Sequence, residues 1–102
     1  MVIPLNKVGF LNYFYYIMVK AIKFYAEWCG PCKAYDKIWN KVKEEITEGV
    51  EYVNINVDKD TTGLAAEYKV RSIPYTVVIK DQAESTKVGL LSENELKELI
   101  TN

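Results

Sequence analysis

The sequence contains no histidine, and this absence excludes several chemistries at once. A Cys–His protease, a zinc site with histidine ligands and any mechanism with an imidazole acid or base all require that residue. The chain also lacks an excess of either charge, with 13 Lys and Arg against 14 Asp and Glu. Nucleic-acid binding depends on a positive field, so we expect no nucleic-acid partner.

The sequence also lacks a hydrophobic run long enough for a membrane span. The most apolar stretch near its start, FLNYFYYIMV at residues 10–19, is too short to cross a bilayer, and Lys20 and Lys23 follow it. A signal peptide, with Lys7 as its charged region, is a weaker alternative because no small-residue cleavage site follows. Helical spacing instead favours a helix packed on the core through Phe10, Tyr13, Phe14 and Ile17. We therefore expect no membrane association.

Cysteine is scarce, since the chain has only two, Cys29 and Cys32. A secreted disulfide scaffold usually carries four or more cysteines. Two thiols separated by two residues instead predict a redox pair in a reducing compartment, which favours the cytoplasm.

The remaining composition is that of one globular domain over residues 1–102, with 49% hydrophobic and 26% charged residues. Periodicity and turn signals predict strands at 2–5, 19–26, 52–57, 75–80 and 85–89, and helices at 7–15, 31–47, 61–68 and from 92 onward. A capping box from Ser92 to Glu95 opens the last helix. The helix at 31–47 should have one apolar face, consisting of Tyr35, Ile38, Trp39, Val42 and Ile46. The order βαβαβαββα indicates an α/β fold. Strands separated by helices should pair in parallel and the closing hairpin antiparallel, giving a mixed sheet with helices on both faces.

The strongest motif is Trp28-Cys29-Gly30-Pro31-Cys32, between a predicted strand and a predicted helix start. A helix N-terminus stabilises an anion, so the Cys29 thiolate should be favoured there, and a thiolate is the form that attacks a disulfide. Cys32 lies in the first turn on the inner side and can resolve the resulting mixed disulfide. Gly30 and Pro31 keep the turn tight enough for the two sulfurs to bond.

The spacing of the two cysteines alone leaves other interpretations of this motif open. A CxxC pair can be half of a zinc site completed by a second chain, a structural disulfide, or a pair of inert thiols. The fold can also serve as a binding subunit of a larger enzyme in which the thiols are incidental. The order of strand, motif and helix favours the redox interpretation.

The segment AEWCGPCK at residues 26–33 resembles the signature of the thioredoxins. The similarity runs from about Phe24 to the end, through VNINVDKD at 53–60, EYKVRSIP at 67–74 and KVGLLSENELKELI at 87–100. The first 23 residues resemble the family only in length and in a strand–helix pattern. Glutaredoxins are a weaker match, since they usually carry Tyr or Phe where Gly30 stands.

This resemblance implies a thioredoxin fold and a protein-disulfide reductase. Cys29 would be the nucleophile, Cys32 the resolving thiol, and Trp28 would shape the docking surface beside an exposed thiol. The alternative for Trp28 is a core tryptophan. The resemblance implies no bound cofactor beyond the redox-active disulfide. It implies as partners client proteins with disulfides and a thioredoxin reductase-type enzyme, and we expect a monomer.

The same resemblance assigns residues on the other side of the site. Pro74 would be a cis-proline facing the disulfide, and Ile73 would offer its backbone to an extended substrate segment. Gly89 and Leu90 would line the substrate groove. Each also has a simpler interpretation: Pro74 as a trans-proline opening an edge strand, Gly89 as a turn glycine and Leu90 as a core leucine.

One departure from the family concerns Lys23, which stands where thioredoxins usually carry a buried Asp. Alternation along the strand puts Lys23 on the face of Tyr25, which in the family points below the motif. A buried ammonium must pair or lose its proton, and Asp36, four residues after Cys32, is the candidate partner. Asp36 would accept the Cys32 proton and Lys23 would stabilise the thiolate, which predicts a raised reduction potential. The alternative is a lysine that extends its ammonium to water.

Overall fold

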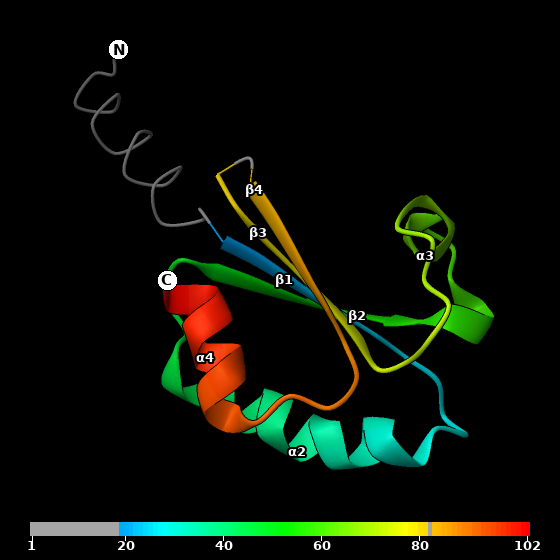
Figure 1. Ribbon diagram of the computed structural model, residues 1–102, viewed down its shortest axis with the longest axis horizontal. Coiled ribbons are helices and arrows are strands. Elements are labelled where there is room, and N and C mark those ends of the chain that lie inside the picture. Colours follow the sequence, from blue (N-terminus) through cyan, green and yellow to red (C-terminus); the bar gives the residue numbers. More distant parts are fainter. Residues whose placement is uncertain (1–18, 82) are drawn as a thin grey trace.

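The computed structural model describes residues 19–81 and 83–102, and its centre is a four-stranded sheet (Figure 1). The strands are β1 (Val19–Tyr25), β2 (Val50–Asn56), β3 (Tyr75–Lys80) and β4 (Ala83–Val88). Their spatial order is β2-β1-β3-β4. The strand predicted at 2–5 and the helix predicted at 7–15 lie outside the described residues.

The sheet is mixed, as predicted. Strand β1 is parallel to β2 and antiparallel to β3, and β3 is antiparallel to β4. The antiparallel β1–β3 pair corrects the expectation that strands separated by helices would all pair in parallel. The helix before β3, α3 (Leu64–Glu67), has four residues and spans only about 6 Å. It cannot carry the chain back along the sheet, so β3 starts near the end where β2 stops.

Helices cover both faces of the sheet, as predicted. The helices α2 (Gly30–Glu45) and α4 (Glu93–Thr101) pack together on one face (Figure 1). The apolar face expected for the first of them is present, and the buried cluster on this side consists of Ala21, Tyr35, Trp39, Val42, Val78, Leu91, Leu96 and Ile100. Side chains of α3 pack on the other face, against the cluster Ile22, Phe24, Ile55 and Val77.

The helix predicted at 61–68 is shorter in the structure because Asp60 holds the preceding turn. Its carboxylate accepts hydrogen bonds from the backbone N–H groups of Thr62 at 2.8 Å and Ala65 at 2.9 Å. Gly63 then has a φ of 79°, in the left-handed region. Local bonds of this kind compete with helical ones, so α3 begins only at Leu64. The predicted capping box of α4 is confirmed.

The candidate site lies where β1 ends and α2 begins. Because β1 and β2 are parallel, their carboxyl ends meet at the same edge of the sheet, and segments that follow both strands surround the site. Across the part of the chain that the structure describes, no helix is long and apolar enough to cross a membrane.

Candidate active site

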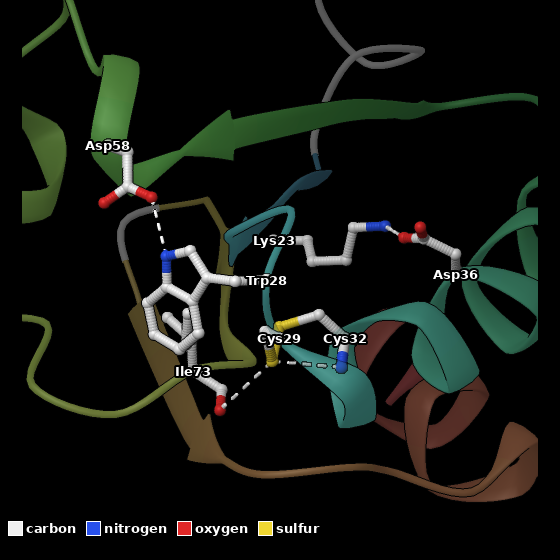
Figure 2. Close-up of a disulfide and its surroundings, with 7 residues drawn as sticks. All are labelled: Lys23, Trp28, Cys29, Cys32, Asp36, Asp58 and Ile73. Carbon is white, nitrogen blue, oxygen red and sulfur yellow. Dashed lines mark hydrogen bonds and ion pairs between the residues drawn. A yellow bond between two sulfur atoms is a disulfide. The ribbon is translucent and has the colours of Figure 1, made fainter.

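Cys29 and Cys32 form a disulfide at the N-terminus of α2, with Cα atoms 5.2 Å apart (Figure 2). Cys29 is the N-cap residue, and its Sγ accepts a hydrogen bond from the backbone N–H of Cys32 at 3.1 Å. Pro31 lies in the first turn, where a missing N–H removes no helical bond. The free N–H groups and the dipole of the helix therefore point at the Cys29 sulfur, where they stabilise negative charge.

Both cysteines are covered in the disulfide state. Cys29 is 5% exposed and Cys32 is 1% exposed, which corrects the expectation of an open thiol at position 29. They pack with Ala26, and the half-buried Val57 and Ile73 lie against this cluster. Cys29 is still the more accessible of the two, while Cys32 faces inward as predicted.

The Ile73–Pro74 peptide bond is cis, as predicted. The carbonyl oxygen of Ile73 lies 3.9 Å from the Cys29 Sγ. Gly89, at a φ of 96°, donates its backbone N–H to the Pro74 carbonyl at 2.8 Å. Leu90 is 50% exposed, so its interpretation as a core leucine is wrong. Segments before β3 and after β4 thus meet beside the disulfide.

Trp28 is 71% exposed, which excludes a core tryptophan. Its Nε1–H donates a hydrogen bond to the Asp58 carboxylate at 2.8 Å (Figure 2). Asp58 follows β2, and its backbone N–H is bound by the Asn56 side chain at 2.9 Å. Asp58 was not among the site residues predicted from the sequence. The available signal was that Trp28 and Asp58 each follow one of two strands that should be parallel.

An open groove of about 320 Å³ extends from the Trp28 side chain along the loop that precedes β3. Its lining is mostly apolar and consists of Trp28, Val57, Ala65, Ala66, Val70, Arg71 and Ile73. The groove is continuous with the Cys29 sulfur through Val57 and Ile73, which pack against the cysteine cluster. A client segment can therefore lie along it while one of its sulfurs approaches Cys29.

Lys23 and Asp36 form the predicted ion pair (Figure 2). The Lys23 side chain is 3% exposed, so the alternative of an ammonium in water is wrong, whereas Asp36 is 47% exposed. The Lys23 Nζ lies 5.3 Å from the centroid of the Trp39 ring and 5.6 Å from that of Tyr25. The contact between these two residues is therefore confirmed.

A second buried polar contact was not predicted. The hydroxyls of Tyr35 on α2 and Thr76 on β3 lie 2.8 Å apart, and both residues are fully buried. Burial raises the pKa of Tyr35 to about 12; the Thr76 hydrogen bond opposes this rise and the charge of Glu95 adds to it. The contact fastens the cysteine-bearing helix to the strand that follows Pro74.

The two cysteines at the N-terminus of α2 can form and break a disulfide reversibly. This couple carries two electrons and needs no cofactor. Among residues 19–81 and 83–102, no cluster of three potential His, Cys, Asp or Glu ligands could hold a metal ion. Combined with this fold, the cysteine pair defines a thiol–disulfide oxidoreductase.

Comparison with known proteins gives the family. The family model described as thioredoxin matches residues 13–102. The thioredoxins of Rickettsia felis and Mycoplasmoides gallisepticum are 35% and 36% identical over 80 residues, which cover 78% of this chain and 75% and 78% of the relatives. The crystal structure of Fasciola hepatica thioredoxin superposes with a TM-score of 0.74 at 31% identity, covering 95% of this chain and 91% of that one. The chain belongs to the thioredoxin family.

Membership implies chemistry through the cysteine pair, without a bound cofactor. It also implies two general kinds of partner, client proteins with disulfides and reductases that return electrons to the pair.

Proposed function

We propose that this chain reduces client disulfides with Cys29 as the attacking thiolate and Cys32 as the resolving thiol. The observation that carries this assignment is the hydrogen bond from the Cys32 N–H to the Cys29 Sγ at 3.1 Å, at the N-cap of α2. The same backbone group and the helix dipole stabilise a thiolate at Cys29 in the reduced protein. Cys32, inside the first turn, has no comparable donors around it among the described contacts.

The exchange proceeds in two balanced steps. The Cys29 thiolate attacks one sulfur of the client disulfide, and the other client sulfur leaves as a thiolate. Cys32 then gives its proton to a base, for which we propose Asp36 one turn further along α2, and attacks the Cys29 Sγ. The Cys29–Cys32 disulfide forms and the second client thiolate leaves. Two electrons have passed to the client, which takes up two protons.

The proposed client site consists of groups around the Cys29 sulfur. Trp28 and the groove beside it offer an apolar surface to the client. The backbone of Ile73, which the cis bond to Pro74 orients, offers hydrogen bonds to an extended client segment. Gly89 borders the other side through its contact with Pro74. Gly30 and Pro31 complete the proposed client site between the two cysteines. The space beside Gly30 is free for a client segment, because a Cβ at Gly30 would meet nothing within 4 Å.

The proposed physiological setting is the cytoplasm, where the chain acts as a monomer and is recycled by a thioredoxin reductase-type enzyme. Its two-cysteine composition suits a reducing compartment. The family supports a reductase partner in general.

Limited alkylation of the fully reduced protein at pH 7 tests the two cysteine roles. Mass spectrometry should find Cys29 modified well before Cys32, because only Cys29 has the stabilised thiolate. With a disulfide-containing client peptide, Cys32→Ser should accumulate a mixed disulfide at Cys29, and Cys29→Ser should accumulate none. Preferential modification of Cys32 would reverse the assignment.

A further inference from the structure

Lys23 is a buried charge that the exchange steps above do not use. It sits in the middle of β1, opposite Asn54 of β2 and Thr76 of β3, and only 3% of it is exposed. Removing an ammonium from water is costly unless a counter-charge and further polar contacts replace the lost hydration. The burial of Lys23 therefore has an energetic cost that a lysine on the surface would not have.

The surroundings of the ammonium are suited to keeping a positive charge. Asp36 on α2 supplies a carboxylate. The rings of Trp39 and Tyr25 lie 5.3 and 5.6 Å from the Nζ, within the range of cation–π attraction. Asp36 is 47% exposed and keeps part of its own hydration. The carboxylate is therefore the more solvated and more strongly screened member of the pair, while the ammonium is enclosed.

The enclosed charge and the sulfurs share neighbouring residues. Asp36 follows Cys32 by four residues, a rise of about 6 Å along the helix and a position on the same face. Tyr25, whose ring lies beside the Lys23 Nζ, also packs against the cluster that contains both cysteines. Figure 2 shows the Lys23 side chain extending from β1 toward α2 in the neighbourhood of the disulfide. The region between them is protein interior, where electrostatic effects are screened less than in water.

We infer that Lys23 is a positioning residue that sets the reduction potential of the Cys29–Cys32 pair, with Asp36 as the counter-ion that holds its ammonium in place. The inference rests on the proposed roles of the two cysteines. The reduced state carries negative charge on a thiolate, and the disulfide carries none. A buried positive charge near the sulfurs stabilises the reduced state, which makes the disulfide a stronger oxidant.

Redox equilibrium with glutathione tests the inference, with the fraction of reduced protein measured over a series of reduced-to-oxidised glutathione ratios. Lys23→Met keeps an apolar stem of similar length and removes the charge. Its equilibrium constant for reduction should fall by about tenfold, since two charges several ångströms apart in a protein interact by about 1–2 kcal/mol. The matched control is Lys97→Met, which removes a lysine paired with Glu45 and Glu93 between α2 and α4, and it should stay within about twofold of the unmodified chain.

The double variant Lys23→Met/Asp36→Asn separates charge from packing. Lys23→Met alone leaves the Asp36 carboxylate without its cation, which further disfavours a nearby thiolate. Removing that carboxylate as well should return the equilibrium constant toward the value of the unmodified chain. A double variant that falls below Lys23→Met would show that removing a negative charge does not favour the thiolate. Lost packing, not charge, would then have caused the fall, and the inference would be overturned.

The failure of this inference differs from the failure of the proposed function. If the unmodified chain equilibrates with glutathione and Lys23→Met matches it within about twofold, the tuning role is wrong and the exchange chemistry stands. If the unmodified chain does not exchange with glutathione at all, the proposed function itself is contradicted. Urea unfolding of each variant at neutral pH verifies that the proteins compared are folded.

Discussion

Among single residues, Tyr35 has the clearest consequence for stability. Its hydroxyl is buried against Thr76, and burial raises its pKa from the usual 10.0 of a tyrosine to about 12. The folded chain therefore holds the phenol proton more tightly than the unfolded chain does. The resulting stabilisation is complete below pH 10 and is lost as the pH rises from 10 through about 12.

Tyr35→Phe should remove this pH dependence. Below pH 9 the variant should lose about 1 kcal/mol of unfolding free energy, because the Thr76 hydroxyl is left without its partner. Between pH 10 and 12 its stability should fall less steeply than that of the unmodified chain. Urea unfolding at a series of pH values measures both effects. Parallel pH profiles for the two proteins would mean that the phenol does not titrate differently on folding.

Some site residues could be predicted from the sequence, because the CxxC motif or the alternation of side chains along a strand identifies their partners. Cys29, Cys32 and the Lys23–Asp36 contact are of this kind. The Tyr35–Thr76 contact joins residues 41 positions apart, through elements whose mutual packing a single sequence does not contain. The Trp28–Asp58 contact joins residues 30 positions apart, and the expected pairing of the strands before them does not determine which side chains meet. Nothing in the local pattern distinguishes Thr76 from another β-branched strand residue.

At the scale of elements, the N-terminus of α4 carries a complete capping box. The Ser92 hydroxyl accepts a hydrogen bond from the Glu95 N–H at 3.1 Å, and the Glu95 carboxylate accepts one from the Ser92 N–H at 2.8 Å. The backbone N–H of Ser92, and to a lesser degree its side chain, lower the pKa of Glu95. The two capping bonds satisfy backbone groups that would otherwise lack a helical partner.

Ser92→Ala should therefore destabilise the chain by about 1 kcal/mol, measured as a lower urea midpoint at unchanged slope. Asn94→Ala is the matched control, because it changes the same helical turn without touching the box and replaces Asn by a better helix former. It should leave stability unchanged or slightly raised. Equal losses in both variants would indicate that the cap contributes nothing specific.

The bounds of a helix or strand could be predicted where no side-chain hydrogen bond competed with the local sequence pattern. The strand at 75–80 was predicted to the residue, and the last helix was predicted from its capping box. The helix at 61–68 was predicted too long because the side-chain bonds of Asp60 outweigh the helical pattern. The direction of β3 was missed for a related reason, since a short helix cannot carry the return that a parallel pair needs.

At the scale of the whole molecule, apolar exposure is concentrated beside the disulfide. The large hydrophobic side chains that are exposed among the described residues are Trp28, Val88 and Leu90. Trp28 adjoins Cys29, and the other two flank Gly89, which is hydrogen-bonded to Pro74. Two separate segments thus bring apolar surface to the place where we propose that a client docks, which is how a binding face differs from scattered exposed residues.

The overall class of fold was accessible from the sequence because strand and helix periods alternate clearly along the chain. The topology was less accessible, because it depends on which elements meet in space. The elements predicted before residue 19 lie outside the described residues and stay predictions.

The central claim is that the Cys29–Cys32 pair reduces protein disulfides. Its most direct test is the rate at which dithiothreitol reduces insulin, followed by turbidity, with the chain added in catalytic amounts. The unmodified chain should accelerate the reaction strongly, and Cys29→Ser should reduce the rate to that of dithiothreitol alone. A Cys29→Ser variant as active as the unmodified chain would contradict the account.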